Sequence, residues 1–142
     1  MIKFPKLQEF QYVSEFQHWF ASIENQWIDV LIPNEYAEIL PEQQFEFLKF
    51  AEPVIAELVE FGQQYIQNLS ALDLRHGELN SIRYHQFNHI ACIELCYVFE
   101  QDPTYLWSVG FEQNPQDGYL LDVSSPCLDY GYSAVILHRE PI

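Results

Sequence analysis

The first amphipathic segment of the chain covers residues 14–28. Ser14 and Gln17 fit a capping box, an arrangement that marks the start of a helix. Large apolar side chains then recur every three or four residues, as they do along one face of a helix. They are Phe16, Trp19, Phe20, Ile23 and Trp27. This spacing predicts a first helix over residues 14–28.

The clearest pattern runs from Pro41 to Leu69. At a helical period its apolar side chains fall on one arc of about half the cylinder, and its polar side chains form the opposite stripe. We therefore predict a long amphipathic helix whose wide apolar arc contacts more than one neighbour. Pro53 lies on the polar stripe, where it either bends this helix or splits it in two. A short helical turn from Glu35 to Leu40 is expected before it.

The period changes after a connector at residues 70–81. From Tyr105 to Phe111, large apolar side chains alternate with the other residues, which is typical of a half-buried strand. Residues 114–118 have turn chemistry, so a hairpin to a further strand at Tyr119 to Val123 is expected. A last strand is predicted from Tyr132 to His138.

Two neighbouring segments between these regions are rich in β-branched and aromatic residues. Ile90 to Phe99 is nearly continuous in apolar residues, which suits a central strand buried on both faces. Ile82 to Phe87 is expected to pair with it. Periodicity alone leaves a helix over residues 82–99 open as the alternative.

These elements predict one α+β domain over residues 1–142. N-terminal helices, at about residues 14–69, are expected to pack on a C-terminal, mainly antiparallel sheet at about residues 82–138. A chain of this length buries a core without help from metals or disulfides.

The charge of the chain is strongly one-sided. Lys and Arg number 6 against 21 Asp and Glu, which gives a formal net charge of -15. Between Leu7 and Leu74 there are twelve acids and one base, Lys49. Such a field repels nucleic acid and anionic membranes and attracts cationic partners. Aromatic residues make up 16% of the chain, so the chain does not have the composition of a disordered protein despite its high charge.

The three cysteines cannot all pair within one chain, and no apolar run has the length or character of a signal peptide. Both observations favour a reducing compartment. No stretch reaches the ~18 to 20 apolar residues of a membrane span. The sequence therefore predicts a cytoplasmic protein.

His85, His89, Cys92 and Cys96 are the most metal-like group in the sequence. On a helix this group would extend over ~16 Å, too far for four ligands of one ion. On a strand, the two odd-numbered histidines and the two even-numbered cysteines would point to opposite faces. We therefore expect two ordinary histidines and two buried thiols, with no metal and no cofactor.

No catalytic motif is present in the sequence. Cys127 and His138 are a conceivable nucleophile and base, but no serine elbow or thiol-activating neighbour accompanies them. Phosphate loops, dinucleotide fingerprints, calcium loops and Cys-x-x-Cys pairs are also absent. We therefore predict no catalytic residues and a protein that is not an enzyme.

The acidic stripe of the predicted long helix is the remaining candidate site. A charged helix face is usually just solvated, but ordinary faces mix Lys with Glu and this one does not. Aromatic residues that could anchor a partner are Trp19, Trp27, Tyr36 and Tyr65. The predicted partner-binding residues are Glu35, Glu38, Glu42, Glu46, Glu57 and Glu60.

In its general character the chain resembles small bacterial immunity proteins, such as those that protect against contact-dependent growth-inhibition toxins. The shared features are a short, acidic, aromatic-rich α+β chain with no catalytic motif. The resemblance implies a stoichiometric inhibitor of a basic cognate toxin, such as a nuclease, and carries over no site residues. Two alternatives remain open. One is an interaction module or assembly subunit; the other is a small enzyme that uses His85, His89, Cys127 or His138.

Overall fold

A computed structural model of the protein describes residues 3–23, 28–33, 42, 45–46, 49, 52–87, 90–113 and 132–142. For residues 33, 85–87, 90–92, 112–113 and 132–138 it describes the backbone without the side chain. The described strands are β1 (Gln11–Val13), β2 (His18–Ile23), β3 (Ile28–Pro33), β4 (Gly77–Phe87), β5 (Ile90–Phe99), β6 (Asp102–Gln113) and β7 (Tyr132–Pro141). The described helices are the 3-10 turns η1 (Leu7–Glu9) and η2 (Glu52–Val54) and the α-helix α2 (Ile55–Leu69).

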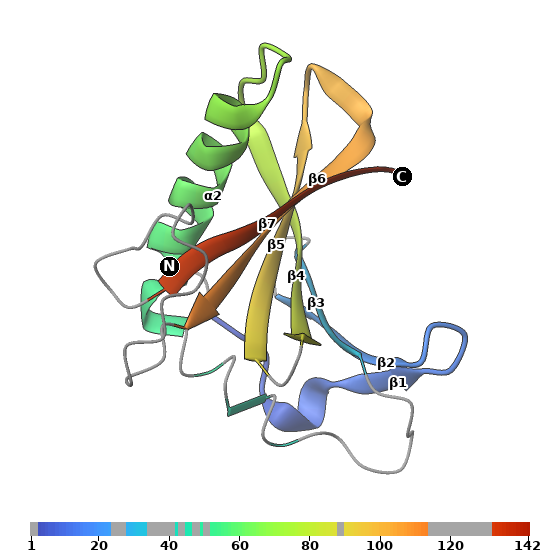
Figure 1. The fold of residues 1–142 in the computed structure, drawn as a ribbon. Coiled ribbons are helices and arrows are strands. Elements are labelled where there is room, and N and C mark those ends of the chain that lie inside the picture. Colours follow the sequence, from blue (N-terminus) through green and yellow to red (C-terminus); the bar gives the residue numbers. More distant parts are fainter. Residues whose placement is uncertain are drawn as a thin grey trace.

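The seven described strands form one mixed sheet in the order of the chain, and among them β1 and β7 are the outermost (Figure 1). Neighbouring strands are antiparallel except β3 and β4, which are parallel. A parallel pair requires a long crossover connection, and α2 lies within this one. The result is an α+β fold built from two antiparallel meanders joined by a helical crossover.

The predicted helix over residues 14–28 is wrong. The structure places a hairpin there, in which β1 and β2 are joined by a turn at residues 14–17. Gln17 has a φ of 52°, so the supposed capping box is the turn of the hairpin. Along β2 the burial has a period of two, because Ala21 and Ile23 are buried and Ser22 is exposed. The N-terminal part of the chain therefore contributes strands where helices had been predicted.

The long amphipathic helix is confirmed over its second half. Ile55, Leu58, Gly62 and Ile66 of α2 are buried, and Glu57, Glu60 and Gln64 of its polar stripe are exposed. Pro53 lies in η2, so the helical segment changes geometry at the position where the proline predicted a bend or a break. Glu42, Phe45, Glu46 and Lys49 are also helical, whereas the predicted turn at residues 35–40 lies outside the described residues. Among the residues that the structure describes, no helix is long and apolar enough to cross a membrane.

The antiparallel sheet of the C-terminal half is confirmed in its described part. β4 and β5 pair over their whole length, so residues 82–87 and 90–99 form a strand pair, and β4 begins at Gly77, inside the predicted connector. β5 is an inner strand, and every residue from Ile93 to Tyr97 is buried, as expected of a strand covered on both faces. The predicted turn at 114–118 and the strand at 119–123 lie outside the described residues.

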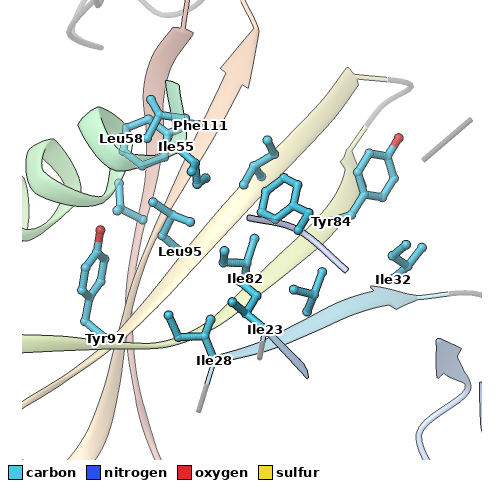
Figure 2. Close-up of a cluster of buried hydrophobic side chains, with 14 of the residues drawn as sticks. Ile23, Ile28, Ile32, Ile55, Leu58, Ile82, Tyr84, Leu95, Tyr97 and Phe111 are labelled. Atoms are coloured by element: carbon cyan, nitrogen blue, oxygen red, sulfur yellow. The ribbon is translucent and has the colours of Figure 1, made fainter. Parts of the chain in front are cut away.

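The core fills the side of the sheet that α2 covers. Alternate residues of β5 and β6 contribute the aromatic and aliphatic part of it, including Leu95, Tyr97 and Phe111, all 0% exposed. Figure 2 shows Phe111 beside Ile55 and Leu58 of α2, with Leu95 next to this group, and residues of β2, β3 and β4 extend the same layer. Packing is close at Gly62, where an added Cβ would lie 2.5 Å from the Tyr97 hydroxyl oxygen. The Tyr97 hydroxyl donates a hydrogen bond of 2.6 Å to the Val59 carbonyl, which ties α2 to the sheet.

Candidate partner-binding surface

The face of α2 that points away from the sheet carries two of the predicted contact residues. Glu57 and Glu60 are exposed, and they lie three positions apart, so they share one side of the helix. Gln64, one further turn along, is exposed as well. Leu58, Gly62 and Ile66 are buried on the opposite side of the helix, which faces the sheet, and this leaves the side of Glu57 and Glu60 to the solvent. We call Glu57, Glu60 and Gln64 the outward face of α2.

Glu42 and Glu46 belong to the helical residues that precede η2. Both are exposed, and they are four positions apart, so they also share one side of their segment. Phe45 between them is buried and packs edge-on against Phe10 at a ring distance of 5.9 Å. Four of the six predicted partner-binding glutamates are therefore solvent-exposed, and their role in binding stays a prediction. The other two, Glu35 and Glu38, lie outside the described residues.

The one base in the acidic stretch of the sequence is held by a local carboxylate. The Lys49 ammonium donates hydrogen bonds of 3.1 Å and 3.0 Å to the two carboxylate oxygens of Glu52. Glu52 also accepts a hydrogen bond of 2.6 Å from the Phe4 backbone amide. Glu52 thus ties the N-terminal segment to η2 and also pairs with the charge of Lys49.

Three further bases are matched in the same way by acids near them in the fold. Arg75 pairs with Asp73 at 2.6 Å, Arg83 with Glu94 at 3.3 Å, and Arg139 with Asp102 at 2.8 Å. None of the ion pairs found among the described residues includes a glutamate of the outward face of α2 or of the Glu42–Glu46 pair. Those exposed carboxylates therefore have no partner cation in the described part of the fold.

The predicted aromatic anchors are not gathered at this surface. Trp19 lies on β2, where its ring meets that of Tyr12 edge-on at 5.4 Å. Tyr65 does lie on α2, but it is half-buried and stacks on Phe61. Trp27 and Tyr36 lie outside the described residues. The outward face of α2 is consequently polar, and none of its three residues is aromatic.

A second polar cluster, on β4 and β5, was missed from the sequence. Arg83 and Glu94 are register partners, and the Arg83 guanidinium also lies 3.6 Å from the Glu140 carboxylate of β7. The Cys96 thiol donates a hydrogen bond of 3.5 Å to Glu94, which is only 7% exposed. Burial, followed by the Glu94 charge, raises the pKa of Cys96 to about 12, so this thiol stays protonated and unreactive at neutral pH.

The prediction that the histidines and cysteines point to opposite faces of a strand is wrong for His85 and Cys92. His85 belongs to β4 and Cys92 to β5, and the two are direct register partners, so their backbone positions share one face of the sheet. The expectation of opposite faces treated residues 85–96 as one strand. His89 lies outside the described residues.

At the other end of the sheet, Asp102 joins β6 to β7. Its carboxylate accepts hydrogen bonds from Arg139 Nε and from Trp107 Nε1, each of 2.8 Å. The Arg139 guanidinium also lies over the Tyr105 ring, 3.6 Å from its centroid. The hydrogen bond from Arg139 is the main reason that the pKa of Asp102 is lowered. This cluster is matched in charge and fixes the end of β7.

Comparison with known proteins adds no relative to this description. No protein-family model matches the chain, and no curated protein or solved structure matches it either.

Proposed function

We propose that the protein is a stoichiometric inhibitor that binds a basic protein partner through the outward face of α2 and the neighbouring exposed glutamates. The observation that carries the proposal is the unmatched acidity of this surface. Glu57 and Glu60 are exposed without a base, whereas the region's one base, Lys49, is bound to Glu52. An unmatched field of this kind steers a cationic partner and speeds its capture.

The class of partner comes from the resemblance to immunity proteins. A toxin that acts on nucleic acid presents a cationic groove, and exposed carboxylates on a rigid helix are suited to occupy it. The mechanism is then one of blocking, in which one inhibitor covers the groove of one toxin. No chemical step by this chain is required.

Affinity capture from native lysate tests the proposal. Capture is performed in about 0.1 M and about 1 M salt, where the Debye length falls from ~10 Å to ~3 Å. We expect one basic protein at low salt, a marked loss of it at high salt, and a titration that ends at one inhibitor per target. A captured protein that is acidic, or whose binding is insensitive to salt, would contradict the electrostatic mechanism.

A second candidate, an interaction module, is favoured by one observation at the sheet edge. Among the strands that the structure describes, β7 is an edge strand of ten residues, and residues 132–137 carry no charge. A long uncharged edge strand is a template for strand addition by another chain. Binding of that kind rests on backbone hydrogen bonds, so it would survive at high salt and leave the α2 glutamates without effect.

A further inference from the structure

The apolar arc of α2 continues past the part of the helix that the sheet covers. Ile66 is 0% exposed, whereas Leu69, the last residue of the helix, is 56% exposed. Leu72, in the connection to β4, is 44% exposed. Figure 1 shows this end of α2 and the connection that follows it at one margin of the fold. We call Leu69 and Leu72 the leucine pair.

A single exposed leucine is common on protein surfaces, but Leu69 ends a row of large side chains. Four residues of α2 follow one another at intervals of four positions, so each is the neighbour of the next on the helix surface: Glu57, Phe61, Tyr65 and Leu69. Phe61 packs edge-on against Phe111 of β6 at a ring distance of 6.1 Å, and Tyr65 stacks on Phe61 at 5.9 Å. Phe61 and Tyr65 are half-buried. The row therefore leads from an exposed glutamate, along the border of the core, to an exposed leucine.

Local hydrogen bonds hold the backbone at this end of the helix. The Ser70 amide donates a bond of 2.9 Å to the Ile66 carbonyl, and the Leu72 amide donates one of 2.9 Å to Ser70 Oγ. The Leu72 carbonyl accepts a bond of 3.0 Å from the amide of Leu74, whose side chain is buried. Leu72 is thus presented to solvent on a backbone that is fixed on both sides. Binding through such a residue costs less conformational entropy than binding through a mobile loop.

The charge along α2 decides which kind of molecule fits this surface. α2 contains no Lys or Arg, and none of the ion pairs among the described residues includes Glu57 or Glu60. Asp73, next to the leucine pair, is neutralised by Arg75 at 2.6 Å. A second copy of this chain and an anionic membrane would both be repelled by the field of the glutamates. The surface is therefore complementary to a protein that has a basic patch beside an apolar pocket.

We infer that the partner of the proposed inhibitor is a basic protein with an apolar pocket about 18 Å from its basic patch, which is the length of the helix between Glu57 and Leu69. Tyr65 and the leucine pair fill this pocket. The inference rests on the proposed function, because it describes the surface of the same partner. The two parts of α2 then have different tasks. The glutamates steer the encounter and set the association rate, whereas the apolar anchors exclude water and slow dissociation.

Surface plasmon resonance with the basic protein captured at low salt separates these tasks. Leu69→Gln/Leu72→Gln should speed dissociation by about tenfold or more and leave association within about twofold of the parent rate. Leu69→Met/Leu72→Met keeps the apolar volume and should bind like the parent protein. Phe16→Gln/Ile142→Gln removes two exposed apolar side chains elsewhere, so this matched control should also retain the parent rates.

Two further measurements separate binding from folding. The midpoint of urea unfolding should be the same for the parent and for the variants, since all four positions are exposed. Hydrogen exchange of the unaltered protein does not depend on any variant. The backbone amides of residues 70–74 should exchange more slowly when the basic protein is bound.

The outcomes distinguish this inference from the proposed function. If Leu69→Gln/Leu72→Gln dissociates at the parent rate while Glu57→Lys/Glu60→Lys still slows association, the apolar pocket is excluded and the proposed function stands. Capture of no basic protein, or rates insensitive to both changes, would contradict the proposed function and this inference with it. Sedimentation that shows a dimer of the parent, dissociated by Leu69→Gln/Leu72→Gln, would place a second copy on the leucine pair and overturn the inference.

Discussion

The outward face of α2 and the polar cluster of β4 and β5 both contain glutamates, but these glutamates differ in burial and in whether a base pairs with them. Glu57 and Glu60 on α2 are exposed and have no base within the described structure. Glu94 on β5 is buried and is matched by Arg83. An unmatched exposed charge acts at a distance, through the field that it projects. A matched buried charge acts locally, because its removal leaves its partner without compensation.

The largest effect is expected from breaking the matched pair. Arg83→Met would remove the Arg83 cation from the Glu94 carboxylate, which is buried beside Cys96. We expect the free energy of unfolding to fall by about 3 kcal/mol, measured by urea denaturation. The double variant Arg83→Met/Glu94→Leu should recover most of the loss, because it removes both charges. Equal stability of Arg83→Met and the parent protein would contradict this view of the polar face.

A smaller loss is expected where α2 meets the sheet. In Gly62→Ala, the new Cβ would lie 2.5 Å from the Tyr97 hydroxyl oxygen and 2.8 Å from Val109 Cγ1, so α2 must shift outward. Overpacking of this kind costs about 1 to 3 kcal/mol. Gln64→Ala, on the exposed side of the same helix, serves as the control and should stay within about 0.5 kcal/mol. A gain in stability for Gly62→Ala would show that the interface has room.

Asp102 is a second acid that is paired with a base, Arg139. Arg139 lowers the pKa of Asp102 in the folded protein, so the ionised carboxylate stabilises the fold above the unfolded-state pKa of about 4. The unfolding free energies of the parent and of Asp102→Asn should therefore differ by a constant amount above that pH. Below it the difference should shrink, as the pH falls through the lowered pKa. A difference that does not change between neutral and acidic pH would exclude this linkage.

The smallest effect on stability is expected on the outward face of α2. Glu57→Gln/Glu60→Gln removes two exposed charges that no base compensates, so the free energy of unfolding should change by less than about 0.5 kcal/mol. At low salt the change should be towards higher stability, since repulsion within an acidic protein is relieved. A clear loss of stability would mean that these carboxylates have a structural role.

The helix that carries this face was predictable because its information is local. Fifteen residues with one apolar arc and one polar stripe have few other ways to bury that arc, and α2 follows the pattern closely. The same reasoning failed at residues 14–28. Within β2, Trp19, Ala21 and Ile23 also fit a period of two, and the burial of Ala21 and Ile23 beside exposed Ser22 shows that sheet pairing decided the outcome.

The polar cluster of β4 and β5 could not be predicted from any local pattern in the sequence. Ser81, Arg83 and His85 alternate with apolar residues in the sequence, as do Cys92, Glu94 and Cys96, and this alternation was the available signal. It shows that each strand has a polar face. Which residues become neighbours is set by the register across the turn between the strands. The exposed glutamates of α2 needed no such knowledge, because helical spacing alone places them.

Binding of the captured basic partner to two charge-reversed proteins tests the central claim most directly. Glu57→Lys/Glu60→Lys alters the outward face of α2, and Glu78→Lys/Glu100→Lys makes the same change in net charge at two other exposed acids. The account predicts that reversal on α2 slows association by about tenfold or more and weakens inhibition, and that the control has a much smaller effect. Equal effects of the two variants would show that only overall charge matters, and no effect of the α2 reversal would place the partner elsewhere on the molecule.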